Sequence, residues 1–202
     1  MRTLRLGPLA AALALVIPCV GAHAQEQRVR THAVELTLSA GAFVPTGTEG
    51  LAGGTSLTRR GAWVGSTHLS LNAPNGWMSG EFEIGLTPER IRQTAGPLAG
   101  SRHTNLWYGT AKVLVGRNPR HAGITYMVGG GLAYIYRKKS VLDPTVSKGV
   151  FGGAAVAHVR IPIDGQVGAR FEAEDLIYSA DYGLGKKVRN DFAITLGLSI
   201  AY

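Results

Sequence analysis

The sequence predicts an all-β fold, an eight-stranded antiparallel up-and-down transmembrane β-barrel, and three observations point to it. The 202 residues include 28 glycines and only 17% charged residues, whereas an average soluble domain has about 7% glycine and about 25% charged residues. Eight segments alternate apolar and polar side chains, as half-buried strands do. Their connectors are long and short by turns, which is typical of a barrel with tight turns at one end and longer loops at the other.

The predicted strands follow one another along the whole chain after residue 32. They cover 33–44, 61–72, 77–87, 104–116, 122–137, 148–161, 166–179 and 189–202. The longer connectors are 45–60, 88–103, 138–147 and 180–188, and they define a long-loop end. The short connectors are 73–76, 117–121 and 162–165, and they define a short-turn end. The short connectors contain residue pairs that favour turns, namely Asn75-Gly76, Asn118-Pro119 and Asp164-Gly165.

The alternation within each strand predicts which face meets lipid. In the last strand one face carries Phe192, Ile194, Leu196, Leu198, Ile200 and Tyr202, and the other carries Asp191, Thr195, Gly197 and Ser199. A membrane barrel is apolar outside, because lipid offers no hydrogen-bond partners, and its interior can be polar. A soluble sandwich alternates as well, so a single strand does not decide between them. Eight such segments with this rhythm of loops favour the membrane barrel.

Aromatic residues gather near both ends of the predicted strands, as two interfacial girdles require. Those near the long-loop end are Trp63, Trp107, Tyr134, Tyr136, Phe151 and Phe192, and those near the short-turn end are Tyr126 and Tyr202. Trp77 is an exception, because its parity predicts that it points inward.

Residues 1–24 have the three parts of a secretory signal peptide. Arg2 and Arg5 precede an apolar stretch over 9–17, and Ala22-His23-Ala24 forms a small-x-small cleavage site. A membrane-spanning helix needs about 20 apolar residues, and this stretch is shorter. We therefore expect a cleaved signal peptide over 1–24 and an outer-membrane β-barrel domain over 25–202.

Three stretches of the predicted barrel resemble a known family. Residues 34–41, residues 168–175 and the closing strand that ends in Tyr202 are similar to the small outer-membrane β-barrel proteins of Gram-negative-type bacteria, the eight-stranded group that includes the OmpA transmembrane domain and OmpX. The resemblance implies a monomer in the bacterial outer membrane. It also implies that the segment from Phe192 to Tyr202 is the signal recognised by the outer-membrane assembly machinery. It does not specify an activity, because the family includes adhesins, integrity proteins and enzymes.

Charged residues are expected inside the barrel, whose eight strands leave only enough space for side chains. The predicted interior polar network consists of Glu81, Glu83, Lys112, His158, Arg160, Arg170, Glu172 and Glu174, and parity adds Glu35, His68 and Asp191. Burying unmatched charges is costly, so we expect these groups to pair and to hold the barrel shut. An ion path and a catalytic carboxylate pair remain alternatives.

Basic residues account for the formal net charge of +8, and they concentrate in the long connectors. The candidates for contact with a polyanion are Arg59, Arg60, Arg90, Arg92, Arg102, Lys138, Lys139, Lys186 and Lys187. Arginine and lysine bind phosphates through charge-assisted hydrogen bonds, and lipopolysaccharide presents phosphates at the outer surface. The expected partners are therefore membrane lipids and lipopolysaccharide, and not nucleic acid.

The sequence favours a structural or surface-interaction role over an enzymatic one, and it predicts no catalytic residue, cofactor or metal site. Two alternatives stay open, a narrow pore or small-solute transporter of the OmpW kind and a lipid A-modifying enzyme. Lipid A deacylases use a histidine, a serine and a glutamate, and the comparable segment Asp175–Ser179 has no histidine beside its serine.

Overall fold

The computed structural model describes residues 33–46, 48–50, 56–74, 76–93, 100–117, 123–138, 148–181 and 186–202, so the predicted signal peptide lies outside the described residues. Ten strands form one sheet, with the bounds β1 Val34–Pro45, β2 Thr48–Gly50, β3 Ser56–Arg60, β4 Ala62–Asn72, β5 Met78–Gln93, β6 Gly100–Arg117, β7 Thr125–Lys138, β8 Lys148–Pro162, β9 Val167–Asp181 and β10 Lys186–Ala201. Among the described residues there is no helix that is both long enough and apolar enough to span a membrane.

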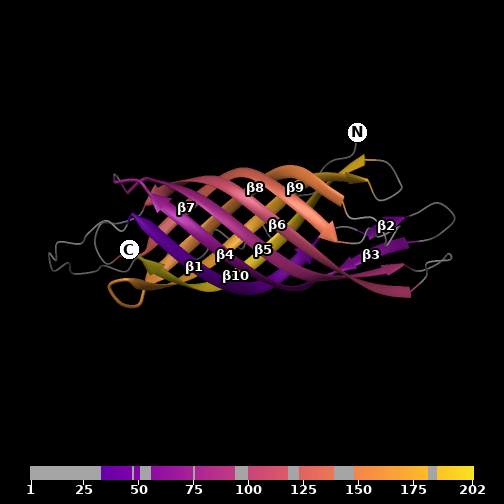
Figure 1. Ribbon diagram of the computed structural model, residues 1–202, viewed down its shortest axis with the longest axis horizontal. Coiled ribbons are helices and arrows are strands. Elements are labelled where there is room, and N and C mark those ends of the chain that lie inside the picture. Colours follow the sequence, from indigo (N-terminus) through magenta and orange to yellow (C-terminus); the bar gives the residue numbers. More distant parts are fainter. Residues whose placement is uncertain are drawn as a thin grey trace, which may run out of the picture.

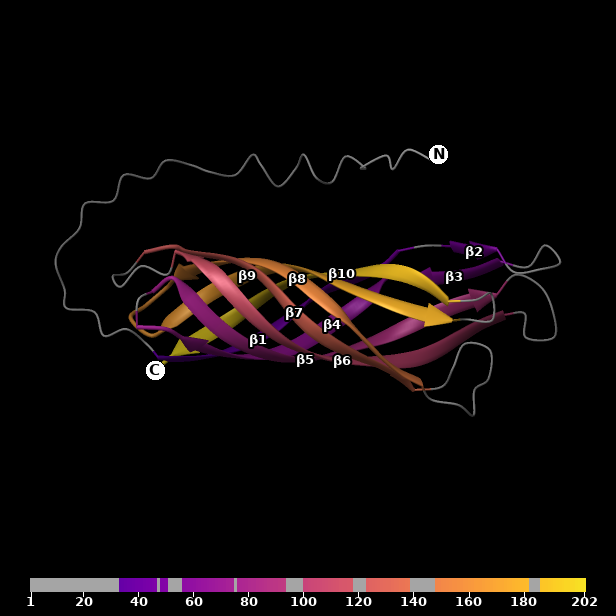
Figure 2. The same ribbon diagram turned by 90° about the horizontal axis from the view of Figure 1, so that it is seen from above.

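Eight of the strands close into a barrel. β1 pairs with β4 on one side and with β10 on the other, and the pairing of β5 with β6 completes the ring. All neighbouring strands are antiparallel, and they tilt across the long axis of the tube (Figure 1, Figure 2). The prediction of an eight-stranded antiparallel up-and-down barrel is confirmed.

The strands reach further toward the long-loop end than the sequence predicts. β5 continues to Gln93 and β6 begins already at Gly100, so most of the connector predicted over 88–103 is strand. The connector predicted over 45–60 contains β2 and β3, which form a small hairpin, and β3 extends the sheet by pairing with β5. Beyond the lipid layer an outward side chain need not be apolar, so the hydropathy alternation disappears although the strands remain paired.

The outer face of the barrel is apolar on every one of its eight strands. Exposed apolar side chains include Leu38 on β1, Leu69 on β4, Ile84 on β5, Val113 on β6, Leu132 on β7, Phe151 on β8, Phe171 on β9 and Leu196 on β10. Seven acidic side chains of the described residues are buried instead, namely Glu35, Glu81, Glu83, Glu89, Glu172, Glu174 and Asp191. This inverted arrangement is that of a barrel surrounded by lipid.

The aromatic residues at both ends are exposed, as the two girdles require. Trp77 differs from its prediction, because its side chain is 67% exposed. β5 begins only at Met78, so Trp77 lies in the turn, where strand parity does not determine the direction of a side chain. In the same turn Gly76 has a φ of 69°, a left-handed conformation that glycine adopts without strain.

Candidate functional site

A cluster of buried charges, here called the central network, fills the middle of the lumen. It consists of His68 on β4, Glu81 and Glu83 on β5, Lys112 on β6, His158 on β8, and Arg170, Glu172 and Glu174 on β9. Residues two apart on a strand share a face, so β5 contributes a pair and β9 a ladder of three. The sheet register then places Glu81 opposite Lys112, and Glu172 opposite His158.

Lys112 and Arg170 each bind several carboxylates of the central network. Lys112 Nζ lies 2.6 Å from Glu83, 2.9 Å from Glu174 and 3.2 Å from Glu81. Arg170 lies 2.7 Å from Glu81 Oε2 and also donates to Glu172 Oε2. The structure thus brings together seven of the eight residues predicted for the interior network, in one buried cluster.

Arg160, the eighth predicted residue, lies nearer the short-turn end. Its Nε is 3.3 Å from Glu35 Oε2 and donates to Ser199 Oγ at 2.7 Å. Arg160 and Glu35 therefore form an ion pair that is separate from the central network and lies on its short-turn side.

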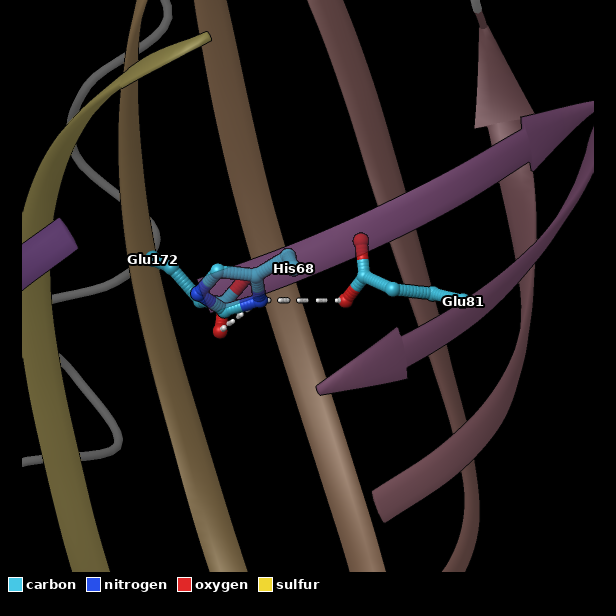
Figure 3. A group of neighbouring side chains, drawn as sticks. All are labelled: His68, Glu81 and Glu172. Carbon is cyan, nitrogen blue, oxygen red and sulfur yellow. Dashed lines mark ion pairs between the residues drawn. The ribbon is translucent and has the colours of Figure 1, made fainter. Parts of the chain in front are cut away.

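Parity predicts that His68 lies inside the barrel, although the predicted network does not include it. Its Nε2 lies 3.0 Å from Ser39 Oγ and 2.9 Å from Ser66 Oγ. Its Nδ1 lies 3.6 Å from Glu81 Oε1 and 3.8 Å from Glu172 Oε1, and these three side chains point toward one another (Figure 3).

A serine, a histidine and a carboxylate in this order suggest a catalytic triad, but the geometry does not fit one. In a triad the histidine Nδ1–H donates a hydrogen bond to the acid, and a distance of 3.6 Å is too long for that bond. The side chains of His68 and Glu81 are completely buried, so no substrate can reach them. The arrangement therefore gives no support to a hydrolase.

An apolar layer lies between the central network and the long-loop end. It is formed mainly by Phe43, Val64, Leu106, Ile135 and Leu176, which have at most 1% exposure. The sequence prediction of a polar interior did not include this layer.

Tyr108 joins the apolar layer to the central network. Its ring occupies the space beside Gly85, where a Cβ would come within 2.1 Å of the ring. The hydroxyl donates to Glu83 Oε1 at 3.0 Å. Glycine at position 85 therefore allows this tyrosine to pack across the lumen.

A second charged cluster, here called the rim network, lies beyond the apolar layer and consists of Arg59, Glu89, Arg137, Tyr178 and Asp191. Arg59 donates to both oxygens of Asp191, at 2.8 and 2.6 Å, and to Glu89. Arg137 Nε lies 3.0 Å from Glu89, and the hydroxyl of Tyr178 donates to Asp191 at 2.6 Å. Along β9 the inward side chains therefore change from charged to apolar at Leu176 and to polar again at Tyr178.

The placement of Arg59 corrects the expectation that it projects from a loop. The segment predicted as a loop is strand β3, and Arg59 is on its inward face with 5% exposure. Its guanidinium binds acids of the lumen and does not face an external polyanion.

Five other predicted basic residues are exposed at the long-loop end, namely Arg60, Arg90, Arg92, Lys138 and Lys187. The backbones of Arg102 and Lys186 lie on β6 and β10, but their side chains, like the whole of Lys139, lie outside what the structure describes. Among the side chains described at this end, the exposed charged ones are all basic. Phe192 and Tyr202, the predicted assembly signal, lie on or directly after β10 and point outward.

A closed antiparallel barrel with an apolar outer face and buried charges in its interior defines a transmembrane β-barrel. Three solved structures with a similar fold are outer-membrane proteins. The chain is similar to OprG from Pseudomonas aeruginosa, with a TM-score of 0.63 and 11% identity, over 85% of this chain and 97% of that chain.

Two further structures are similar over most of their length. A major outer membrane protein from Thermus thermophilus has a TM-score of 0.53 and 13% identity, over 85% of this chain and 100% of that chain. AlkL in DMPC lipid bilayers has a TM-score of 0.51 and 13% identity, over 91% and 96%. No protein-family model and no curated protein sequence match the chain. The resemblance to small outer-membrane barrels is confirmed at the level of the fold.

Proposed function

We propose that this protein is a structural or surface-interaction barrel of the bacterial outer membrane, whose basic long-loop end contacts the phosphates of lipopolysaccharide. The observation that carries the proposal is the separation of charge between the inside and the outside. Arg60, Arg90, Arg92, Lys138 and Lys187 are exposed at the long-loop end, whereas Glu89 and Asp191 at the same end are buried. The exposed bases are therefore not neutralised by these acids.

A surface on which all the described exposed charges are basic is attracted electrostatically to a layer of phosphates. Each Lys or Arg close to an anionic membrane surface contributes about 1 kcal/mol of binding, and salt weakens the attraction. Arginine also binds phosphate through two parallel hydrogen bonds.

A charge-reversal experiment tests this proposal. In the variant, Arg90, Arg92, Lys138 and Lys187 are all changed to Glu, and lipopolysaccharide binding to the barrel in phospholipid nanodiscs is measured across a salt series. We expect binding to weaken by at least about tenfold and to lose most of its salt dependence. In the matched control the charge is kept, with Arg90→Lys, Arg92→Lys, Lys138→Arg and Lys187→Arg, and binding should be retained. Equal binding by both variants would exclude the proposal.

The proposal includes the location and the maturation of the protein. Cleavage after Ala24 and insertion through the segment Phe192 to Tyr202 would deliver residues 25–202 to the outer membrane. N-terminal sequencing of protein from an outer-membrane fraction tests this, and a chain that starts at Met1 would contradict it.

The pore alternative receives no support from the described part of the lumen. The central network, the apolar layer and the rim network cross it in succession, and each consists of buried side chains. We therefore expect planar-bilayer recordings to show no stable channel, and a reproducible unitary conductance would favour the pore.

A further inference from the structure

The central network contains more acid than base. Four carboxylates, those of Glu81, Glu83, Glu172 and Glu174, face the two permanent cations Lys112 and Arg170, and every one of these side chains is at most 3% exposed. Buried charges that are not matched cost several kcal/mol each. A divalent cation would bring this set of six groups to neutrality.

Three buried polar atoms of the network also have no hydrogen-bond partner, namely His68 Nδ1, His158 Nδ1 and Glu174 Oε2. His68 is completely buried, and its Nε2 is occupied by the hydroxyls of Ser39 and Ser66. These serines hold the imidazole so that Nδ1 is directed at three carboxylates, those of Glu81, Glu83 and Glu172, and Figure 3 shows the first and the last. Ligands of a metal ion are commonly oriented by such secondary hydrogen bonds.

We propose that the central network binds one divalent transition-metal cation between His68 Nδ1 and the carboxylates of Glu81 and Glu172. One ligand atom from each of these three residues lies within 4.8 Å of the other two. An imidazole with two carboxylates is a ligand set that suits Zn²⁺ and similar ions.

The distances fit a metal ion better than a shared proton. Nδ1 lies 3.6 Å from Glu81 Oε1 and 3.8 Å from Glu172 Oε1, and both separations exceed the length of an N–H···O hydrogen bond. Atoms bound to a tetrahedral Zn²⁺ at 2.0–2.1 Å are separated by about 3.4 Å. Small movements of the two carboxylates would therefore bring three of the four ligands of a tetrahedral ion to binding distance.

The basic side chains of the network position the ligands. Arg170 holds Oε2 of both Glu81 and Glu172, and the Oε1 atoms are the ones nearest to His68. Glu81 Oε1 also accepts from Arg170 at 2.9 Å and lies 3.2 Å from Lys112 Nζ, so a bound metal ion would replace one of these two contacts at that oxygen.

A small hollow lies on the short-turn side of the cluster, next to the proposed ligands but not lined by them. It has a volume of about 10 Å³, enough for about one water, and is lined by Ser70, His158 and Arg170 of the middle lumen and by Glu35 and Arg160 nearer the short-turn end. The apolar layer covers the other side of the network. The ion would therefore enter from the short-turn end.

Calorimetric titration with Zn²⁺ tests the site in the tag-free, EDTA-treated barrel in detergent micelles. We expect one Zn²⁺ per chain, and we expect His68→Gln to weaken binding by at least about tenfold. The matched control is His103→Gln, which makes the same change at an exposed histidine of β6 outside the network, and its affinity should stay within about twofold of the starting protein. No binding at one ion per chain, or an equal loss in both variants, would overturn the proposal.

A second measurement does not depend on the folding of either variant. X-ray absorption at the zinc edge of the Zn²⁺-loaded original protein should show one imidazole among oxygen ligands. A shell of oxygen atoms alone would overturn the proposal, because it would place the ion among Glu83, Glu172 and Glu174, which form the neighbouring group of three.

Discussion

The central network and the rim network are two buried charge clusters in one lumen, but their charges are balanced differently. In the rim network Arg59 and Arg137 match Glu89 and Asp191, and Arg189 is buried at the same end. In the central network four carboxylates surround one lysine and one arginine. The rim network therefore has enough base for its acids, whereas the central network has too little.

This difference separates two uses of buried charge. A matched cluster can close the lumen by itself, because each acid has a base within hydrogen-bond distance. A cluster with surplus acid depends strongly on its few cations, and it is stabilised when one carboxyl group keeps its proton or when a further cation binds. Four pairs of substitutions measure this asymmetry in metal-free buffer, with urea unfolding in lipid vesicles followed through Trp63, Trp77 and Trp107, which are exposed on the barrel surface.

Removal of Lys112 should have the largest effect. Lys112→Met leaves Glu83 and Glu174 without their principal cation, and the loss of one partner of a buried ion pair costs about 3–5 kcal/mol. The control is Lys187→Met, which removes an exposed lysine and should change stability by less than about 0.5 kcal/mol. Similar losses in both variants would show that the central network does not depend on Lys112.

Removal of Arg59 from the rim network should lower the free energy of unfolding by less, about 2–3 kcal/mol. In Arg59→Met, Glu89 keeps its pair with Arg137 and Asp191 keeps the hydroxyl of Tyr178. The neighbouring exposed residue supplies the control, and Arg60→Met should be nearly neutral. A loss for Arg59→Met as large as that for Lys112→Met would remove the contrast between the two clusters.

The sequence was sufficient to predict the barrel and most of the central network, because both follow from local alternation. A period of two assigns Glu81 and Glu83, and likewise Arg170 and Glu172, to the lumen without any knowledge of their partners. The antiparallel order of the strands also follows, because short connectors join neighbours.

Two features could not be predicted, because they depend on register between strands or lie where hydropathy carries no signal. The approach of His68 to Glu81 and Glu172 joins three strands, and no spacing along the chain indicates it. Arg59 lies on a strand beyond the lipid layer, where outward residues such as Arg60 and Arg90 are charged as well. Inward and outward faces then look alike, and the pattern that identifies a buried arginine is lost.

Loss of a tyrosine hydroxyl should also distinguish the two clusters, with a smaller loss of stability than the removal of Lys112 or Arg59. Tyr108→Phe removes a donor to Glu83 in the cluster that has surplus acid, and we expect a loss of about 2 kcal/mol. Tyr178→Phe removes a donor to Asp191, which keeps two hydrogen bonds from Arg59, and we expect a loss of about 1 kcal/mol. The reverse order of the two losses would contradict the proposed shortage of donors in the central network.

The smallest expected effect is a gain in stability, in the variant Glu174→Gln. Glu174→Gln removes one negative charge from the central network but keeps a carbonyl oxygen that can accept from Lys112, which now donates to Glu174 at 2.9 Å. The amide also gives the position occupied by the unpartnered Oε2 a group that can donate to a neighbouring carboxylate. We therefore expect stability to rise by about 1 kcal/mol or less.

The corresponding change in the rim network is Glu89→Gln, which should lower stability by about 2 kcal/mol, because Glu89 accepts from both Arg59 and Arg137. The two variants make the same chemical change in one lumen, so their difference isolates the charge of the surroundings. A gain for Glu174→Gln with a loss for Glu89→Gln would establish surplus acid in the central network alone. A loss of equal size in both would mean that each network is matched, and the electrostatic reason for a bound cation would disappear.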